Sequence, residues 1–401
     1  MAMSNPLWLT LIGLGEDGLD GLSIASQKAL KSAEWVFGAE RHLSLLPAQL
    51  VEKSITWPVP FESGVKALLQ KRGQNVVMLT SGDPFWYGAG SVITRHLGPE
   101  EWTAHPAPSC FSLAASHLGW SLETTKCHAL HAAPFSKIKK DLHPHQRCLV
   151  TLRDGQSAAA LAQYLCEEGF GDSTLTVCEA MGGPRQRVRK TTAKLFDFRD
   201  VIHPVMAAIE PSAGPSLPFA NGLADELFEH DGQITKSPIR ALTLSALAPR
   251  PGERLWDIGA GSGSISIEWL LAHPTCQAIA LEANAIRVKR IVQNANRFGV
   301  DRLQVIHAKA PEGLNELDPP DAVFIGGGLN EELLLQILGR VRGGTRLVIN
   351  AVTLESEALL IEKQRAMGGQ LMRFDISSLN AIGTKRGWKA AYPVVQWSVT
   401  I

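Results

Sequence analysis

The segment LWDIGAGSGSISIEW, residues 255–269, constrains the fold of this chain more than any other stretch. An apolar run ends at Asp257, glycines follow at 259, 261 and 263, and a helical pattern resumes at Ile265. Glycine adopts positive φ readily and lets the backbone approach a ligand closely. A strand, a tight turn and a helix in this order predict the nucleotide-binding turn of an open α/β sheet.

The spacing of these glycines distinguishes two kinds of nucleotide-like ligand. A dinucleotide fingerprint is G-x-G-x-x-G/A, whose third small residue lets the helix pack closely on the strand. That third position is Ser264 counted from Gly259 and Ser266 counted from Gly261, so the fingerprint fails in both registers. The motif present, D-x-G-x-G-x-G, resembles the glycine-rich turn of Rossmann-like S-adenosylmethionine-dependent methyltransferases.

Two further strand ends extend the site predicted in this half. Glu282 closes the next expected strand, where a carboxylate can accept hydrogen bonds from ribose hydroxyls. A third strand ends in HAKAPEG, which offers residues 308–310 as an edge for adenine. The predicted cofactor-binding residues of this half are Asp257, Gly259, Ala260, Gly261, Gly263, Glu282, Ala308, Lys309, Ala310, Gly326 and Gly327.

The length of the chain and the order of the expected elements indicate two domains. A chain of 401 residues exceeds one ordinary hydrophobic core. Strands alternate with helices from residue 254 onward, which predicts a parallel sheet covered on both faces, and residues 7–210 also read as α/β. The Pro-, Gly- and Ser-rich segment 210–232 predicts a linker. The predicted fold class is α/β with two domains, 1–214 and 215–401.

A second candidate site lies in the N-terminal half. LIGLGEDGLDGLS reads as a strand, a glycine-rich turn and a helix start, and SGDPFWYGAG, residues 81–90, ends a later strand. Gly82 and Asp83 would expose backbone N–H groups and a carboxylate there, and Pro84 fixes the exit direction. A helix that begins at Ser109 offers free N–H groups to a polar ligand.

Together these segments resemble the tetrapyrrole methylase family, which binds S-adenosylmethionine between two α/β subdomains without a Rossmann motif. The resemblance covers most of residues 7–210, through RHL, SGDPFWYG, PAPSCFSLAASHLGW, CEAMGGPRQRV and HPVMAAIE. Two departures stand in this half: Ala132-Ala133 replaces a Gly-Arg pair, and Arg185-Gln186 replaces an acidic pair. The cofactor-binding residues that the resemblance implies here are Leu14, Gly15, Ser81, Gly82, Asp83, Trp86, Ser109, Cys110 and Leu152.

The C-terminal half resembles the decarboxylating precorrin methyltransferase family over GQITKSPIRALTLSAL, WDIGAGSGSISIEW, DAVFIGGGL, NAVTLESEALL and GWKAAYPVVQW. Both halves in this order resemble the bifunctional methyltransferases of corrin (cobalamin) biosynthesis. The resemblance implies two S-adenosylmethionine sites, one per domain. It assigns C5 methylation to the N-terminal half, and C15 methylation with decarboxylation of the C12 acetate to the C-terminal half. The implied substrate is precorrin-6B and the implied product is precorrin-8.

The implied chemistry asks for positioning and exclusion of water more than for a strong base. Carbon attack on a methyl sulfonium is an in-line displacement on a pre-charged electrophile, and the conjugated macrocycle can accept the electrons released by decarboxylation. No Ser/His/Asp or Cys/His constellation is evident, so neither a catalytic side chain nor a metal is predicted. The carboxylates of the substrate need polar and cationic partners. The candidates are Lys385 and Arg386 in a glycine-bounded loop, Asn350, Thr353 and Glu355 at a strand end, and Arg185, Arg187 and Arg189.

Three alternatives remain open at this point. A nucleic-acid methyltransferase with an accessory N-terminal domain would need a basic stripe with stacking aromatics, whereas Lys+Arg and Asp+Glu both number 39. A zinc site could use the Cys and His residues at 127, 128, 131, 143, 145 and 148, but their spacing fits no regular zinc pattern. In a third alternative the N-terminal half only binds tetrapyrrole, and the number of methyl donors bound per chain distinguishes it.

The expected location and partners follow from simpler features. The first residues lack a basic region followed by a cleavable apolar segment, and no apolar run approaches the roughly 20 residues that span a bilayer. We therefore expect a cytoplasmic protein with reduced thiols and no membrane partner. The expected partner is the tetrapyrrole substrate, and relatives of the C-terminal half suggest a homotetramer formed through that domain.

Overall fold

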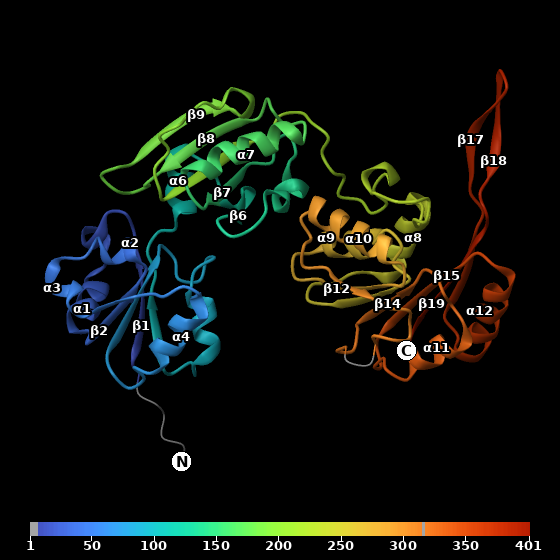
Figure 1. The fold of residues 1–401 in the computed structure, drawn as a ribbon, viewed down its shortest axis with the longest axis horizontal. Helices are drawn as coiled ribbons and strands as arrows, with labels where there is room; N and C mark the ends of the chain where they lie inside the picture. Colours follow the sequence, from blue (N-terminus) through green and yellow to red (C-terminus); the bar gives the residue numbers. More distant parts are fainter. Residues whose placement is uncertain (1–6, 315–316) are drawn as a thin grey trace, which may run out of the picture. The chain divides into compact units, whose positions relative to one another are not determined.

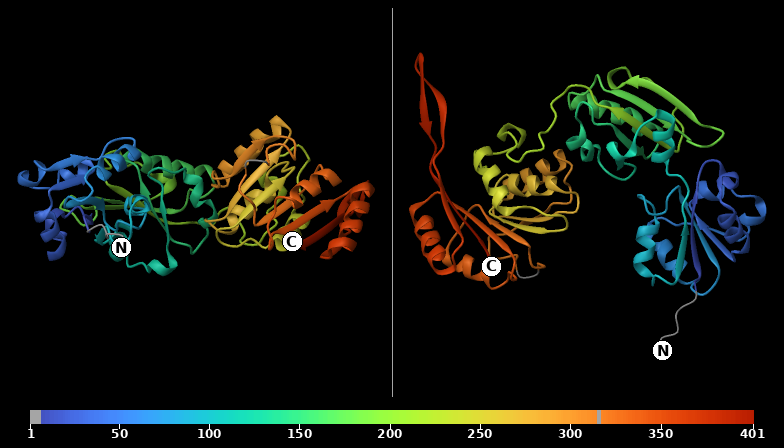
Figure 2. Two further views of the ribbon diagram at one scale, coloured as in Figure 1. Left: turned by 90° about the horizontal axis from the view of Figure 1, so that it is seen from below. Right: turned by 180° about the vertical axis from the view of Figure 1, so that it is seen from behind.

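The computed structural model describes residues 7–314 and 317–401, which form two α/β units with separate cores (Figures 1 and 2). Unit 1 comprises Met1–Phe135 and Asp141–Pro215, and unit 2 comprises Ser136–Lys140 and Ser216–Ile401. Unit 1 contains two five-stranded sheets, and unit 2 contains a seven-stranded sheet and an exposed two-stranded one.

The first sheet of unit 1 is parallel, with five strands in the order β3-β2-β4-β1-β5. The interior strand β1 is fully buried because apolar helix residues cover both faces of the sheet. The strands are β1 (Leu9–Leu14), β2 (Trp35–Gly38), β3 (Ser54–Thr56), β4 (Val76–Ser81) and β5 (Trp102–His105). The helices are η1 (Gly18–Gly21), α1 (Ile24–Ser32), α2 (Glu40–Leu43), α3 (Ala48–Val51), α4 (Phe61–Leu69), α5 (Gly90–Ile93) and η2 (Thr94–His96).

The second sheet of unit 1 is mixed, in the order β6-β7-β10-β8-β9. Strand β10 runs antiparallel to both neighbours, and β9 runs antiparallel to β8. Helix α6 packs on this sheet through Phe111 and Ala115, and α7 contacts β7 and β10. The strands are β6 (Lys126–Ala129), β7 (Cys148–Leu152), β8 (Thr174–Glu179), β9 (Arg187–Thr192) and β10 (Val205–Glu210); the helices are α6 (Cys110–Leu118), η3 (Leu122–Thr124), α7 (Gly155–Glu167) and η5 (Ala193–Leu195). The helix η4 (Phe135–Asp141) interrupts this part of the chain, and its residues Ser136–Lys140 belong to unit 2.

Unit 2 is built on a seven-stranded sheet in the order β13-β12-β11-β14-β15-β19-β16. Helices α8, α9 and α10 cover one face, and α11 and α12 cover the other. The strands are β11 (Arg254–Ile258), β12 (Gln277–Glu282), β13 (Gln304–His307), β14 (Ala322–Ile325), β15 (Arg346–Ala351), β16 (Gln370–Phe374) and β19 (Val394–Thr400). The helices are η6 (Asp225–Leu227), α8 (Ser237–Leu247), α9 (Ser264–Ala272), α10 (Ala285–Arg297), α11 (Glu331–Leu338) and α12 (Leu354–Met367).

The expectation of a purely parallel sheet in unit 2 is wrong at its last strand. β19 pairs antiparallel with both β15 and β16. A parallel neighbour needs a crossover connection, usually a helix, whereas β16 and β19 are joined through a two-stranded hairpin. This hairpin, β17 (Ser377–Ile382) and β18 (Lys385–Ala390), replaces the loop that was expected around residues 379–388, and it turns at Gly383, whose φ is +61°.

The segment between the two units is only partly a free linker. Leu217 and Leu223 are buried in the core of unit 2. The fully buried Arg240 on α8 holds the following turn, because its Nε lies 2.6 Å from Glu268 and its Nη1 lies 3.1 Å from Asp225. The backbone N–H groups of Gly222 and Leu223 also donate to Glu268. The second half of segment 210–232 is therefore part of unit 2.

Candidate functional site

The glycine-rich turn of unit 2 joins β11 to α9, at the point where the strand order reverses between β11 and β14. Gly259, Gly261 and Gly263 have φ of +71°, +61° and +75°, a region that other residues enter at a cost of about 1–2 kcal/mol. A Cβ on Gly259 would lie 2.9 Å from the carbonyl oxygen of Gly327. The turn therefore needs glycine for its dihedral angles and for its contact with the loop after β14.

Asp257, near the end of β11, supports this turn from below. Its side chain is fully buried, and its Oδ2 accepts hydrogen bonds from the backbone N (3.2 Å) and the Oγ (2.6 Å) of Ser266 on α9. Its Oδ1 has no partner among the described residues. Burial raises the pKa of Asp257 to about 6, although the bonds from Ser266 act in the opposite direction. Asp257 thus ties β11 to the first turn of α9 and lies beneath the cavity rather than on its wall.

The raised pKa of Asp257 gives the stability of unit 2 a pH dependence of known sign. The folded-state pKa of about 6 exceeds the value of about 4 in an unfolded chain, so the contribution of Asp257 is full below about pH 4 and is lost as the pH rises through about 6. From this residue alone we expect the free energy of unfolding to fall by on the order of 3 kcal/mol across that window. Asp257→Asn should remove this part of the slope. Urea-dependent hydrogen exchange of α9 peptides measures it, and equal slopes in both proteins would contradict the assignment.

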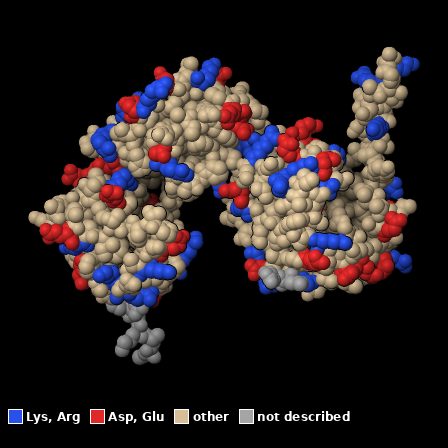
Figure 3. All heavy atoms as spheres, in the orientation of Figure 1, with Lys and Arg blue, Asp and Glu red and all other residues tan. Residues whose placement is uncertain are grey.

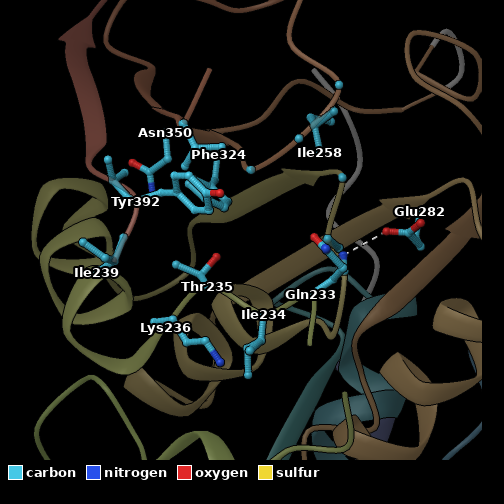
Figure 4. Close-up of a pocket in the computed structure, with 18 of the residues that line it drawn as sticks. Gln233, Ile234, Thr235, Lys236, Ile239, Ile258, Glu282, Phe324, Asn350 and Tyr392 are labelled. Carbon is cyan, nitrogen blue, oxygen red and sulfur yellow. Dashed lines mark hydrogen bonds between the residues drawn. The ribbon is translucent and has the colours of Figure 1, made fainter. Parts of the chain in front are cut away.

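Glu282, the last residue of β12, is fixed at the edge of the same turn. Its Oε2 accepts the backbone N–H of Gly261 and its Oε1 accepts that of Asn284, both at 2.9 Å. Figure 4 shows the Glu282 carboxylate and the first of these bonds on the wall of the cavity. Each carboxylate oxygen keeps a further lone pair. Glu282 can therefore accept the two hydroxyls of a ribose while it holds the turn.

A cavity of about 1300 Å³ opens over the carboxyl ends of these strands. This volume exceeds the roughly 300–1,000 Å³ of ordinary small-molecule pockets, so there is room for more than a nucleoside-sized ligand. Of the cofactor-binding residues predicted in this half, Asp257 and Gly263 lie outside the wall. The wall includes Gly259, Ala260, Gly261, Glu282, Ala308, Lys309, Ala310, Gly326 and Gly327.

The residues predicted to bind substrate in this half separate into two groups. Asn350, at the end of β15, lies on the wall of the cavity. Thr353 instead caps α12, because its Oγ1 accepts the backbone N–H of Ser356 at 3.3 Å, and Glu355 lies in the exposed first turn of that helix. Lys385 and Arg386 are exposed at the turn end of the hairpin. These four residues are not among those that line the cavity.

Several wall residues of unit 2 were not predicted. Gln233, Thr235 and Lys236 come from the segment before α8, which the buried Arg240 holds in place (Figure 4). Lys389 and Tyr392 come from the base of the hairpin. The stretches GQITKSPIRALTLSAL and GWKAAYPVVQW both carried the family resemblance, so both held a usable signal for these residues.

The turn of unit 1 that follows β4 meets the start of α6. Gly82 has φ of +55°, and a Cβ there would lie 2.9 Å from both the carbonyl oxygen of Pro108 and the Cα of Ser109. Ser109 caps α6, since its Oγ accepts the backbone N–H of Ser112 at 3.1 Å. The backbone of the loop after β4 is therefore in contact with the backbone that precedes α6, next to the free N–H groups of the first turn of that helix.

A second cavity, of about 780 Å³, lies over these loops within unit 1. Among the predicted cofactor-binding residues of this half, Asp83 alone is not on the wall described for the cavity; its Oδ1 accepts the backbone N–H of Phe85 at 2.8 Å. Burial raises the pKa of Cys110 to about 11, so that its thiol stays protonated at neutral pH. The predicted residues on the wall are Leu14, Gly15, Ser81, Gly82, Trp86, Ser109, Cys110 and Leu152.

An ion-pair cluster borders this second cavity. Glu16 accepts hydrogen bonds from Arg41 and from Arg185, whose Nη2 lies 3.2 Å from its Oε2. Arg41 also donates to the Oγ of Ser81 at 2.6 Å. Burial, with Arg41 adding to it, lowers the pKa of His42 to about 3, so that His42 is neutral and does not add a positive charge to the wall.

The arginines predicted to meet substrate in unit 1 are engaged within the protein. Arg187 and Arg189 on β9 both bind Glu179, which is fully buried, and Asp200, which is exposed. Neither arginine lines the cavity. Arg153 does line it and donates to the carbonyl oxygen of His131 at 3.1 Å; its charge acts on the neighbouring Asp154, but it forms no ion pair within residues 7–314 and 317–401. Arg153 is the cation that sequence reasoning missed, because a lone arginine after a strand carries no motif.

The structure also bears on the alternatives of a zinc site, a membrane span and a nucleic-acid surface. Within residues 7–314 and 317–401, no three His, Cys, Asp or Glu side chains are grouped as ligands for a metal ion. His128 instead pairs with Asp141 at 3.0 Å. No helix in the described part of the chain is both long and apolar enough for a membrane span. Figure 3 shows Lys and Arg interspersed with Asp and Glu on the face drawn, with no continuous basic stripe for nucleic acid there.

Comparison with known proteins identifies both halves. Residues 8–196 match the family model of tetrapyrrole (corrin/porphyrin) methylases, and residues 226–401 match that of the precorrin methyltransferase domain. A precorrin-6Y C(5,15)-methyltransferase [decarboxylating] of Sinorhizobium sp is 46% identical over 398 residues, covering 98% of this chain and 96% of the relative. The protein of the same name from Mycobacterium tuberculosis is 38% identical over 399 residues, covering 98% and 99%.

A shorter relative matches only part of the chain. A cobalt-precorrin-6B C(15)-methyltransferase (decarboxylating) of Salmonella typhimurium is 31% identical over 179 residues, covering 43% of this chain and 92% of the relative. The two full-length matches confirm the predicted fold class and the resemblance of the whole chain. This chain therefore belongs to the family of decarboxylating precorrin-6Y C(5,15)-methyltransferases.

Proposed function

We propose that this chain is a bifunctional S-adenosylmethionine-dependent methyltransferase of cobalamin biosynthesis, which methylates C5 and C15 of precorrin-6B and removes the C12 acetate carboxylate to give precorrin-8. The observation that carries the proposal is the presence of two separate cavities, one in each unit, in a chain that matches its relatives over its whole length. Each cavity lies where glycines with positive φ follow a buried parallel strand.

We further propose that the two methylations are divided between the units, with C5 methylation in residues 1–214 and C15 methylation with decarboxylation in residues 215–401. The halves match two different family models. The Salmonella typhimurium relative is named for C15 methylation and decarboxylation alone, although the match spans only 179 residues. A half-length protein that carries those two steps supports their separation from C5 methylation.

The two cavities fit S-adenosylmethionine through different residues. In unit 2 the turn at Gly259–Gly263 and Glu282 would hold the nucleoside, because Gly259, Gly261 and Glu282 line the cavity and the Glu282 carboxylate can still accept ribose hydroxyls. In unit 1 the loop at Gly82 and the start of α6 would hold it. Bound S-adenosylmethionine supplies an electrophilic methyl group on a sulfonium. The residues of each cavity bind and orient the methyl donor and the tetrapyrrole, and they exclude water. This is the assistance that such a displacement requires.

The cations on the walls suit a substrate with several carboxylates. Arg153 in unit 1 and Lys389 in unit 2 each line a cavity, and neither forms an ion pair within the described part of the chain. Charge-assisted hydrogen bonds to carboxylates are stronger than neutral ones. We therefore propose these two residues, with Asn350, as the substrate contacts within the cavities. Lys385, Arg386, Thr353 and Glu355 lie outside the wall of the unit 2 cavity and remain sequence predictions. The hairpin exposes Leu379, Ile382 and Trp388, which is compatible with the homotetramer expected through unit 2; the tetramer and the cytoplasmic location remain predictions.

Donor stoichiometry and product mass test this function. Titration of the chain with S-adenosylhomocysteine in a calorimeter should give two bound molecules per chain, because each unit has its own cavity. Incubation with precorrin-6B and S-adenosylmethionine should give a product with two added methyl groups and one carboxylate fewer. One bound molecule per chain would contradict the two-site arrangement, and an unchanged tetrapyrrole would contradict the function itself.

A further inference from the structure

Three polar side chains meet between helix α8 and the sheet of unit 2. Thr243 and Gln396 are fully buried, and Asn350 is the member of the group that reaches the cavity. Asn350 on β15 and Gln396 on β19 are directly opposite each other in the antiparallel pair. Figure 4 shows Asn350 beside Phe324 and Tyr392, on the other side of the view from Glu282.

The hydrogen bonds of this group fix which way each amide faces. The Thr243 hydroxyl lies 2.8 Å from the carbonyl oxygen of Ile239, one turn earlier on α8, and a carbonyl can only accept. The Thr243 oxygen must therefore accept from the amides, and Asn350 Nδ2 lies 2.9 Å and Gln396 Nε2 3.2 Å from it. Gln396 Nε2 also donates to Asn350 Oδ1 at 2.9 Å.

This arrangement leaves Asn350 as a hydrogen-bond donor toward the cavity. One N–H of Asn350 Nδ2 is used by Thr243 and one lone pair of its Oδ1 by Gln396, so the second N–H remains, and a carboxylate, which can only accept, can pair only with that N–H. With the amide reversed, Asn350 Nδ2 would face the N–H group of Gln396 and its oxygen would face an oxygen that cannot donate. The carbonyl of Ile239 thus determines, through Thr243 and Gln396, which way the amide of Asn350 faces.

Packing alone does not account for this group. Gln396 Oε1 is buried without a partner among the described residues, and a buried acceptor left unpaired destabilises the folded state. An apolar side chain at 396 would avoid that cost, because the face of the sheet toward α8 is otherwise packed with apolar residues such as Leu244 and Val348. The amide of Gln396 is explained by what it does to Asn350.

We propose that Thr243 and Gln396 are positioning residues that hold Asn350 as a donor to a carboxylate oxygen of a ligand in the cavity of unit 2. The proposal rests on the function proposed above, in which both ligands, the amino-acid portion of S-adenosylmethionine and the acetate or propionate groups of the macrocycle, carry carboxylates. A carboxylate accepts such a bond more strongly than a neutral oxygen does.

Substitutions in the full-length chain test the relay through KM and kcat for formation of the C15-methylated, decarboxylated product. Thr243→Val removes the hydroxyl and keeps the shape, and we expect it to raise one KM several-fold with little change in kcat. Thr243→Ser keeps the hydroxyl and should restore the normal KM. Gln396→Met should act as Thr243→Val does. Asn350→Leu should raise the same KM about ten- to hundredfold, the range for a lost bond to a charged group, and Asn350→Asp should raise it further by repulsion.

The KM that changes identifies the source of the carboxylate. A rise for the tetrapyrrole alone assigns Asn350 to the macrocycle, and a rise for S-adenosylmethionine alone assigns it to the donor; both outcomes support the proposal. Unchanged KM values in Thr243→Val and Gln396→Met, in proteins with a normal melting temperature, would overturn it. A wild-type chain that forms no such product would instead contradict the proposed function.

Discussion

A chain carrying Gly261→Leu is expected to release a product methylated at C5 alone, with its C12 acetate intact. Gly261 has φ of +61° and lines the cavity of unit 2, and its N–H donates to Glu282. A leucine there costs about 1–2 kcal/mol in backbone strain, and its side chain would extend from the turn that holds the nucleoside. We expect loss of C15 methylation and of decarboxylation together, measured by mass spectrometry of the product.

Gly252→Leu is the matched control for this substitution. Gly252 also has a positive φ, +83°, but a Cβ there meets nothing within 4 Å, and the residue does not line the cavity. The control imposes similar backbone strain without blocking the site, so it should give the fully processed product. If Gly261→Leu removed both methylations while Gly252→Leu removed neither, the division of the two methylations between the units would be wrong.

Residues that lie together in one local motif were the easiest to predict. The turn at Gly259–Gly263 and the strand end at Glu282 are set by short-range geometry, because a strand, a glycine turn and a helix can be recognised within fifteen residues. The order of alternating strands and helices likewise predicted two α/β domains. Asn350 was predicted because it ends a parallel strand, and such ends gather at one edge of a sheet.

Residues whose partners are distant in the sequence could not be assigned in this way. Arg187 and Arg189 were expected to meet substrate, but the antiparallel register of β8 and β9 places Arg187 opposite Glu179, so their charges are neutralised inside unit 1. Lys385 and Arg386 were expected in a loop because Gly383 was read as a boundary. In the structure Gly383 is the turn of a hairpin, whose strands carry both cations away from the cavity wall.

The group around Gln396 shows the same limit at the level of single hydrogen bonds. Asn350 and Gln396 are 46 residues apart, and Thr243 lies 107 residues from Asn350. Within β19, a single glutamine between Val395 and Trp397 carries no indication of its partner. Only the pairing of β15 with β19, and the position of α8 across them, brings the three side chains together. The hydrogen bonds at this edge of the unit 2 cavity therefore depend on tertiary contacts that the local sequence does not reveal.

The reciprocal substitution, Gly82→Leu, is expected to abolish C5 methylation and to leave C15 methylation and decarboxylation in place. Gly82 has φ of +55°, and a Cβ there would lie 2.9 Å from the backbone of both Pro108 and Ser109, neither of which is a flexible side-chain end. The loop after β4 must then move away from the start of α6, and that movement opens the wall of the cavity in unit 1. Unit 2 has its own core and its own cavity, so its chemistry does not depend on this loop.

Gly73→Leu controls for the strain in Gly82→Leu, because Gly73 has φ of +86° and a Cβ there meets nothing within 4 Å. We expect Gly73→Leu to bind two molecules of S-adenosylhomocysteine per chain and Gly82→Leu to bind one. Product mass with precorrin-6B should then show one added methyl group and one carboxylate fewer for Gly82→Leu alone. Persistence of C5 methylation in that variant would remove the cavity of unit 1 from the reaction and would leave the N-terminal half without the role proposed for it.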